Sequence, residues 1–266
     1  TWQADPVLET YSVLFNWSRL EEDGIRRALS LAIDRDAIAA LAGITGKPAA
    51  GLVPPGVPEG EKDFRTTGGN LLDHDGETYE DRCREAVELM QEAGYDRGSD
   101  LSTELGAPEY LYVDEGANAA VAAVCEMWNQ CLGLRVTPRA VTKTELVTAM
   151  RGGENTLAGM GLDAVCNDAE CFLMDWMTGN QNNFLHYENS AYDTLMSIIA
   201  SAEDGTARMG CLHDAEDLLL EIDCALAPLY TTGTAWQLRD TYGGGFRDPR
   251  GWFDFRGVYL KPVTVQ

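Results

Sequence analysis

Carboxylates and an amide alternate with large apolar side chains between Met160 and Trp176. Apolar walls beside carboxylates are typical of a pocket that takes a cationic, partly apolar ligand. Because Asn and Asp also favour turns, a loop that satisfies its own backbone is the alternative for this stretch. Both interpretations rest on the same polar side chains, which are Asp163, Asn167, Asp168, Glu170 and Asp175.

No enzymatic signature stands out in the sequence. The glycine run at 243–245 lacks the Lys-Ser/Thr pair that a phosphate-binding loop requires, and neither HExxH nor GxSxG occurs. The only histidines, His74, His186 and His213, are widely separated, and we expect each of them at the surface. The sequence therefore predicts a protein that is not an enzyme and that uses neither a metal nor a cofactor.

The seven cysteines leave two interpretations open. An odd count leaves at least one thiol unpaired in a monomer, and the closest pairs do not have the CxxC spacing of zinc or redox sites. Buried free thiols are one interpretation, since Cys is commonly buried. A disulfide, either Cys125–Cys131 or Cys166–Cys171, is the other. A thiol enzyme with Cys166 as nucleophile and His186 as base is a separate alternative.

The charge balance excludes some partners. Of 266 residues, 43 are Asp or Glu and 20 are Lys or Arg, which gives a net charge of −23. Such a charge repels phosphate backbones, so we expect no nucleic-acid partner. An acidic interaction scaffold stays open, with the charge as its only support. No apolar run is long enough to cross a bilayer, and residues 1–6 lack the pattern of a signal peptide.

Hydrophobic periodicity predicts strands that alternate with helices. Alternation from Tyr11 to Asn16 indicates a strand, Asp34 or Asp36 caps a short helix, and Thr142 opens another helix through a capping box. The Pro- and Gly-rich stretch 43–76 indicates a long irregular excursion. This order predicts an α/β architecture with a mixed sheet. Helices are expected at 25–33, 38–41, 83–93, 119–132, 142–150, 192–199 and 212–222, and further strands at 101–105, 110–113, 134–137, 158–165, 227–232 and 258–265.

Several segments resemble the extracytoplasmic solute-binding proteins of peptide-type ABC importers, the oligopeptide- and dipeptide-binding proteins. Residues 25–38 (IRRALSLAIDRDAI) are similar to the signature helix pair of that family, and residues 48–56 (PAAGLVPPG) are similar to the loop that follows it. The resemblance runs over nearly the whole chain in the order of the family. Further similar segments are 86–95, 127–134, 182–189, 214–216 and 227–230.

The resemblance implies the C-terminal lobe of a two-lobed, periplasmic-binding-protein-like fold. Residues 1–16 resemble a strand that crosses from the missing N-terminal lobe, residues 17–257 the C-terminal ligand-binding lobe, and residues 258–266 a return strand, so the two ends are expected close together. The implied function is capture of a peptide or another small solute and its delivery to ABC permease subunits. The implied location is extracytoplasmic, either the periplasm or a cell-surface lipoprotein of a prokaryote, with the export signal outside this fragment.

The resemblance also points to ligand-binding residues. In peptide binders an aspartate that holds the ligand's amino terminus follows a Gly-Trp element. Here Val165 stands at the aspartate position and Leu162 at the tryptophan position, while Gly159 replaces an arginine. Asp163 is the carboxylate that remains nearby. These changes leave other cargoes open, such as a metal chelate, haem or a sugar. The candidate ligand-binding residues are Gly159, Gly161, Leu162, Asp163, Val165, Asn167 and Trp176.

Overall fold

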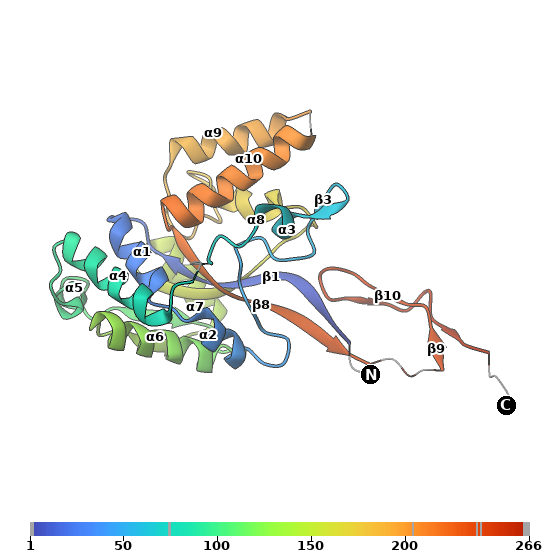
Figure 1. Ribbon diagram of the computed structural model, residues 1–266, viewed down its shortest axis with the longest axis horizontal. Coiled ribbons are helices and arrows are strands. Elements are labelled where there is room, and N and C mark those ends of the chain that lie inside the picture. The colour runs from blue at the N-terminus through green and yellow to red at the C-terminus, as the bar shows by residue number, and fades with distance from the viewer. Residues whose placement is uncertain (1–2, 74–75, 204, 238, 240, 263–266) are drawn as a thin grey trace.

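A mixed six-stranded sheet forms the frame of the computed structural model, which describes residues 3–73, 76–203, 205–237, 239 and 241–262 (Figure 1). The central strand β1 (Gln3–Phe15) pairs antiparallel with both of its neighbours. In contrast, β5 (Glu109–Tyr112) runs parallel to β7 (Leu157–Asp163) and to β6 (Thr137–Ala140). The predicted α/β fold with a mixed sheet is confirmed. The strands are, in spatial order, β2 (Lys47–Pro48), β8 (Leu226–Trp236), β1 (Gln3–Phe15), β7 (Leu157–Asp163), β5 (Glu109–Tyr112) and β6 (Thr137–Ala140).

Both faces of β1 are largely buried from Leu8 to Phe15, which places this half of the strand at the centre of the lobe. Side chains of a strand alternate between its two faces. Tyr11, Val13 and Phe15 pack in one cluster of buried side chains, and Leu8 and Leu14 pack in the other. The alternation in the sequence therefore predicted a real strand, and the structure extends that strand towards the N-terminus.

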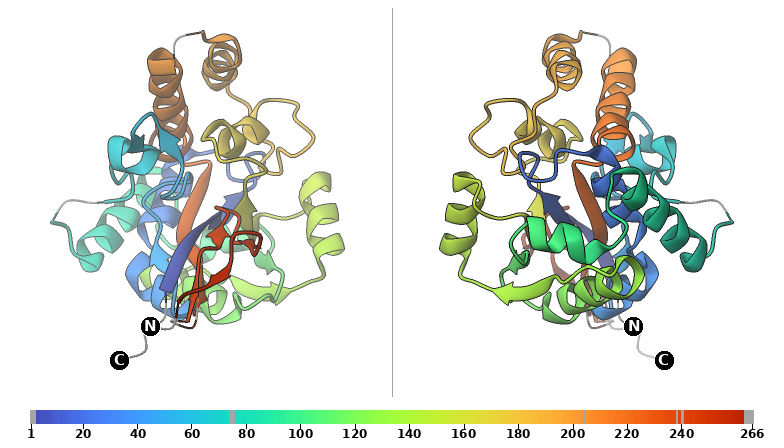
Figure 2. Two further views of the ribbon diagram at one scale, coloured as in Figure 1. Left: turned by 90° about the vertical axis from the view of Figure 1, so that its right-hand side faces the viewer. Right: turned by 90° about the vertical axis from the view of Figure 1, so that its left-hand side faces the viewer.

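Helices from the first half of the chain pack on the face of Tyr11, and Figure 2 shows helices around the central strands. Trp128 is fully buried here, and its indole Nε1 donates to the carbonyl oxygen of Leu29 at 2.8 Å, which ties two helices together. Asp34 accepts from the backbone N–H of Ala37 at 3.2 Å, so this predicted cap is confirmed. The helices are α1 (Asp23–Leu31), α2 (Arg35–Leu41), α4 (Tyr79–Glu92) and α6 (Asn118–Leu132).

A second group of helices covers the face of Leu14. Thr142 accepts from the N–H of Glu145 at 3.2 Å, and the Glu145 carboxylate accepts from the N–H of Thr142 at 2.8 Å. The predicted capping box is therefore confirmed. This group consists of α7 (Lys143–Gly152), α8 (Glu170–Leu173), the 3₁₀ turn η1 (Met174–Trp176), α9 (Ser190–Ser201), α10 (Gly205–Asp217) and the π-helical turn η2 (Leu218–Ile222).

The irregular excursion contains β3 (Pro58–Glu59), β4 (Lys62–Asp63) and α3 (Phe64–Gly68), and it docks on α10. Arg65 forms a buried ion pair with Glu216. Glu216 also accepts from the backbone N–H of Val53 at 2.8 Å. A buried carboxylate thus joins two points of the excursion to the helix layer.

His213 is half-buried, whereas its acidic helix suggested a fully exposed position. Its ring stacks on Phe64, with ring centroids 3.9 Å apart, and its Nε2 lies 3.0 Å from a carboxylate oxygen of Glu59. The excursion folds back over α10 and covers part of this side chain, which stays 21% exposed. His74 lies outside the described residues.

The C-terminal segment forms an extension beyond the sheet (Figure 1). Gln3 of β1 lies opposite Trp236 of β8, so the first described strand begins at the end of the molecule from which the extension leaves. The strand expected at 258–265 is much shorter in the structure, and residues 263–266 lie outside the described range. The extension contains β9 (Tyr242–Gly243), β10 (Phe246–Arg247), β11 (Phe253–Asp254) and β12 (Tyr259–Leu260).

Two predicted strands were wrong. Residues 101–105 form the end of helix α5 (Gly98–Glu104), in which the Ser102 hydroxyl donates to the carbonyl oxygen of Gly98 at 3.0 Å. A short apolar run does not distinguish a strand from a helix. The strand expected at 134–137 begins only at Thr137, because Leu134 and Val136 are buried in the core beside α6 before the chain joins the sheet.

Candidate functional site

A pocket of about 270 Å³ opens at the carboxyl ends of β5 and β7. Ligands of open α/β sheets bind outside the carboxyl ends of the parallel strands, so this is the expected position of a binding site. The pocket is lined by residues of β1, β7 and β8 and by the segments that begin α6 and α7. Its polar lining consists of Glu9, Tyr11, Glu115, Lys143, Asp163, Tyr230 and Thr232.

The register of β1 with its two neighbours gathers these side chains on one face. Glu9 lies opposite Asp163 and Tyr11 opposite Gly161 on β7, while Tyr11 lies opposite Tyr230 on β8. Directly opposed residues of an antiparallel pair point to the same face. The rings of Tyr11 and Tyr230 stack in parallel with centroids 5.1 Å apart, and they form an aromatic wall of the pocket.

Two glycines of β7 make room for this arrangement. A Cβ on Gly159 would lie 2.5 Å from the Tyr110 hydroxyl and 2.8 Å from the Tyr11 hydroxyl, and a Cβ on Gly161 would lie 2.9 Å from the carboxyl carbon of Glu9. Contacts this short force a neighbour to move. Glycine at both positions therefore permits the close approach of the side chains that surround the pocket.

The tyrosine hydroxyls beside Gly159 are unusual. Tyr11 and Tyr110 are buried, and neither hydroxyl has a hydrogen-bond partner in the described part of the chain. Burial raises the pKa of both phenols well above the ordinary value, because the charged phenolate would be desolvated. Both groups are therefore neutral donors at physiological pH. A ligand in the pocket lies beside Tyr11, which is one of its lining residues.

The pocket is electronegative. Burial and, second, the charge of Asp163 raise the pKa of Glu9, while a hydrogen bond from Thr232 opposes the shift. Burial and then the charge of Glu9 raise the pKa of Tyr230 to about 12. Glu115 adds a third carboxylate to the lining, against the single ammonium group of Lys143.

The structure brings together three of the seven predicted site residues. Gly159, Gly161 and Asp163 line the pocket, and the first two act through the absence of a side chain. Leu162 packs against the core cluster on the face of Leu14, because neighbours on a strand point to opposite faces. The sequence did not single out Glu9, Tyr11, Glu115 or Tyr230, although Glu9, Tyr11 and Val13 occupy alternating positions that continue the predicted strand.

The other three predicted residues lie apart from the pocket. Val165 is 78% exposed and Asn167 is also exposed, in the loop that follows β7. Trp176 is buried in the core, and its Nε1 donates to the carbonyl oxygen of Phe172 at 2.9 Å. Its hydrogen-bonding group is thus used within the protein, and its ring faces the helix layer rather than the pocket.

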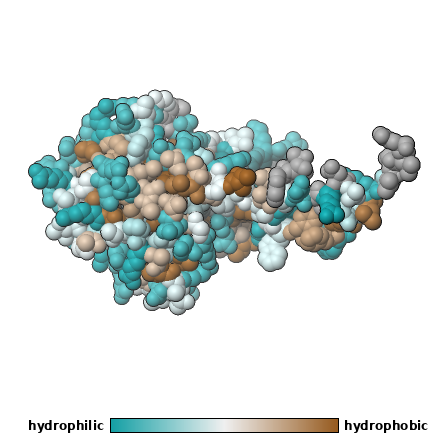
Figure 3. Space-filling model, turned by 90° about the horizontal axis from the view of Figure 1, so that it is seen from below, coloured by the Kyte–Doolittle hydropathy of each residue, from teal (hydrophilic) through white to brown (hydrophobic). Residues whose placement is uncertain are grey.

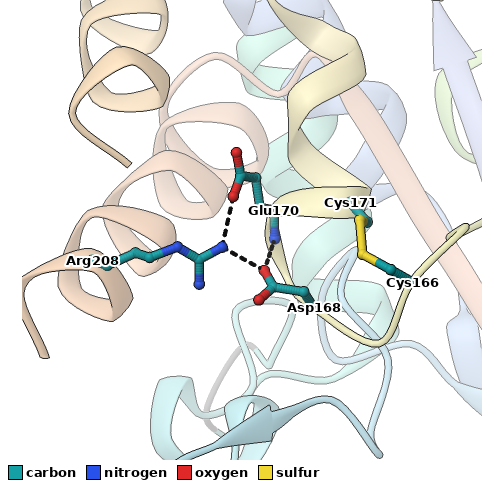
Figure 4. The surroundings of a disulfide bond; sticks show 5 residues. All are labelled: Cys166, Asp168, Glu170, Cys171 and Arg208. Carbon is teal, nitrogen blue, oxygen red and sulfur yellow. Dashed lines mark hydrogen bonds and ion pairs between the residues drawn. A yellow bond between two sulfur atoms is a disulfide. The ribbon is translucent and has the colours of Figure 1, made fainter. Parts of the chain in front are cut away.

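A disulfide closes the loop after β7 (Figure 4). Cys166 is bonded to Cys171. Arg208 donates to Asp168 at 2.7 Å and to Glu170 at 2.6 Å, and Asp168 also accepts from the backbone N–H of Glu170 at 2.9 Å. These contacts hold residues 166–171 as an ordered loop whose polar side chains are used within the protein. This agrees with the turn interpretation for this part of the segment.

The disulfide decides between the alternatives for the cysteines. Cys125 and Cys131 are free, so only one of the two suggested pairs is bonded. The thiol-enzyme interpretation was wrong, since Cys166 has no free thiol. Its suggested base, His186, places Nε2 2.7 Å from the carbonyl oxygen of Met150.

A larger groove of about 820 Å³ lies at the opposite, amino-terminal ends of β5 and β6. Several of its charged side chains already have partners within the protein. Arg139 donates to Glu109 at 2.8 Å, and Glu145 caps α7. The smaller pocket is the stronger candidate, because it lies at the carboxyl ends of the parallel strands and several polar side chains converge on it.

The described residues contain no cluster of three His, Cys, Asp or Glu side chains that is arranged to hold a metal ion. In that same part of the chain, none of the helices is both long and apolar enough to span a membrane.

The mixed α/β sheet has the fold of periplasmic-binding-protein-like peptide-binding structures. The family model for bacterial extracellular solute-binding proteins, family 5 middle region, matches residues 1–184. The chain therefore belongs to the family 5 bacterial extracellular solute-binding proteins, and the predicted membership is confirmed.

Two curated relatives illustrate this family. The chain is 30% identical over 239 residues to the probable deoxycholate-binding periplasmic protein YgiS of Escherichia coli, a match that covers 89% of this chain and 42% of YgiS. It is 25% identical over 268 residues to the periplasmic oligopeptide-binding protein OppA of Haemophilus influenzae, covering 96% of this chain and 46% of OppA. The chain thus spans less than half the length of these relatives.

Solved structures show the same fold. The substrate-binding domain of the oligopeptide ABC transporter of Bacillus anthracis superposes with a TM-score of 0.78 at 20% identity. The match covers 98% of this chain and 51% of the B. anthracis chain. The H. influenzae OppA complex with the peptide RPPGFSPFR gives a TM-score of 0.76 at 24% identity, with 97% and 50% covered.

Proposed function

We propose that this chain is the C-terminal, ligand-binding lobe of a solute receptor that serves an ABC importer, and that a peptide or another small solute binds in the pocket of Glu9, Tyr11 and Asp163. The observation that carries the proposal is the position of this pocket in a chain of this family. It lies at the carboxyl ends of the parallel strands, and Gly159, Gly161 and Asp163, which the family resemblance selected, line it.

The proposed receptor has two lobes. Residues 1–16 form the strand that crosses from a first lobe, residues 17–257 the ligand-binding lobe, and residues 258–266 the start of the return. The terminal extension supports the presence of a first lobe, because Trp252 is 74% and Phe255 72% exposed. Apolar side chains gather along the extension in Figure 3. A first lobe would cover them, and exposed apolar patches mark interaction surfaces.

Such a receptor works by population shift. The solute contacts both lobes in the closed form, so its binding energy favours closure over the open form. This chain supplies one wall of the site, and the desolvation of the solute stays incomplete without the other wall. In the proposed receptor the closed form presents the solute to ABC permease subunits, in the periplasm or at the cell surface as a lipoprotein.

The class of cargo follows from what this chain has in place of the peptide-binding pattern. By the family resemblance, Val165 stands at the position of the aspartate that peptide binders share. Its side chain is exposed and lies outside the pocket. A peptide stays the first candidate, because relatives named as dipeptide- and oligopeptide-binding proteins match nearly the whole chain. A non-peptide cargo is the second candidate, because YgiS is named for deoxycholate.

Nuclear magnetic resonance can test the proposal on this chain. We expect a pool of tripeptides, or deoxycholate in a separate titration, to shift the backbone resonances of Gly159, Gly161 and Thr232. Gly161→Val places a branched side chain against Glu9 and should abolish these shifts. Thr148→Leu alters the larger groove instead and should leave them intact. If no solute moves the pocket resonances, or if the shifts map to the larger groove, the proposed site is wrong.

A further inference from the structure

We infer that Cys83 and Cys131 are a site of reversible oxidation, at which a disulfide forms between α4 and α6 when the protein meets an oxidant that itself carries a disulfide bond. Both cysteines have free thiols in the structure. The inference goes beyond the proposed function, because it concerns the frame of the lobe rather than the solute pocket. It also gives Cys131 a partner other than Cys125, which the sequence suggested.

The first support is the contact between the two residues. Their helices lie side by side on the Tyr11 face of the sheet (Figure 1). The Cys131 thiol donates to the backbone carbonyl oxygen of Cys83, with 3.7 Å between sulfur and oxygen. Each sulfur changes position by rotation about its own Cα–Cβ bond. Because the sulfur of Cys131 already touches Cys83, rotation of the two side chains is enough to join the sulfurs without a shift of either helix.

The second support is an interaction between the side chains themselves. Burial and then a hydrogen bond with the Cys83 side chain raise the pKa of the Cys131 thiol. Burial and then a hydrogen bond with Cys83 also raise the pKa of Tyr79, which lies one helical turn before Cys83 on α4. The Cys83 thiol therefore lies between a phenol and the second thiol. Two thiols in contact point towards each other, which is the orientation that a disulfide requires.

The other free cysteines of the described chain differ from this pair. Cys125 and Cys131 are six residues apart on one helix, so they point to different sides of it. Cys125 is only 2% exposed, and burial raises the pKa of its thiol to about 12. Cys224 is 4% exposed, and its thiol donates to the carbonyl oxygen of Glu221. Cys83 and Cys131 are each partly exposed, which gives an oxidant access to both.

The third support is the disulfide that the chain already contains. Cys166 is bonded to Cys171, and disulfides persist in oxidising compartments. An environment that maintains this bond offers the same chemistry to another pair of adjacent thiols.

The oxidation is a thiol–disulfide exchange in two steps. The Cys83 thiolate attacks one sulfur of the oxidant, forms a mixed disulfide and releases the other half as a thiolate. The Cys131 thiol then loses its proton, and its sulfur attacks the sulfur of Cys83 and displaces the remaining half as a second thiolate. The two protein thiols together lose two protons and two electrons, and the disulfide bond of the oxidant is reduced to two thiols.

The test counts free thiols on this chain in a buffer of reduced and oxidised glutathione. An excess of reduced glutathione keeps lone thiols free, whereas the adjacent pair closes because its second step is intramolecular. The protein is then unfolded in the presence of N-ethylmaleimide and weighed by mass spectrometry. Five cysteines are free before oxidation, and a bond between two of them leaves three, so we expect the number of labels to fall from five to three.

Peptide mapping of the wild type identifies the partner and depends on no variant. Trypsin places Cys83 in the dipeptide 83–84 and Cys131 in the peptide 98–135. We expect the dipeptide to be attached to peptide 98–135 and to be released by a reductant. Peptide 98–135 also contains Cys125, so Cys125→Ser is the matched control and should keep the attachment, whereas Cys131→Ser should abolish it.

A change in stability follows from the same bond. It would close a loop of sequence separation 48, which restricts the unfolded chain. The oxidised wild type should therefore unfold at a higher urea concentration than before oxidation, and Cys131→Ser should show no such increase.

Several results would overturn the inference. These are five labels after oxidation, a glutathione that stays attached to Cys83, attachment of the dipeptide through Cys125, or an unchanged urea midpoint of the oxidised wild type. Protection of the two thiols by zinc ions in the absence of oxidant, reversed by a chelator, would identify a metal site instead and would also show that the inference is wrong.

Discussion

Gly159→Ala tests the packing that holds the pocket in place. The new Cβ would lie 2.5 Å from the hydroxyl and 2.7 Å from a ring carbon of Tyr110, and 2.8 Å from the hydroxyl of Tyr11. Both rings are buried in the core and have little room to move. Overpacking in a core costs about 1–3 kcal/mol, and three contacts below van der Waals distance place this variant near the upper end, at about 2–3 kcal/mol.

The assay is urea unfolding followed by circular dichroism, with a second glycine as the matched control. Gly210 lies in α10 and a Cβ there meets nothing within 4 Å, so Gly210→Ala should stabilise the protein by about 0.5–1 kcal/mol through helix propensity. Tyr110→Phe removes the nearest clashing atom and should recover part of the loss in the double variant. If Gly159→Ala is as stable as Gly210→Ala, Tyr11 and Tyr110 do not crowd Gly159, and the packing described beside the pocket is wrong.

Three further changes have expected outcomes. The pKa of Glu9 is raised in the folded state, so its ionisation opposes folding, and Glu9→Gln should be more stable than the wild type at neutral pH. This advantage should vanish as the pH falls through the raised pKa to the ordinary value of 4.5. Urea unfolding measures it across this range, and an advantage that is independent of pH would contradict the burial of Glu9. Replacing both Cys166 and Cys171 by Ser opens a loop of sequence separation 5 and should lower the free energy of unfolding by about 2 kcal/mol. An unchanged midpoint of urea unfolding would contradict this and show that the contacts of Arg208 already order the loop. Glu216→Ala leaves Arg65 buried without its carboxylate and should lower the free energy of unfolding by about 3–5 kcal/mol. Glu85→Ala breaks an exposed pair with Arg27 and should lower it by under about 1 kcal/mol. Similar losses for both variants in calorimetry would refute the difference in burial.

Local patterns of the sequence predicted most of the frame. The capping box of Thr142 and the cap of Asp34 are contacts within one turn of chain, and the helical stripe through Trp128 is a spacing within a single helix. The helix α5 was missed because the run Leu101 to Leu105 is short, and its conformation depends on close packing against residues 132–134, which lie far away in sequence.

The site was harder to predict than the fold. The resemblance selected Gly159, Gly161 and Asp163 on β7, but the partners of these residues come from β1 through the antiparallel register. Nothing in the sequence around Glu9 states that it lies opposite Asp163. Val165 was selected by its position in the family resemblance and Trp176 as an aromatic side chain of the polar segment, and the turn after β7 carries both away from the pocket.

Native mass spectrometry tests the central claim, capture of a solute between two lobes, most directly. The protein is purified from rich medium in two forms: this chain alone, and a receptor in which the missing lobe precedes it. The account predicts that the two-lobed form retains a non-covalent small molecule and that the single chain retains little of it, because half of the binding wall is absent. Equal retention by both forms, or no bound solute in the two-lobed form, would contradict the account.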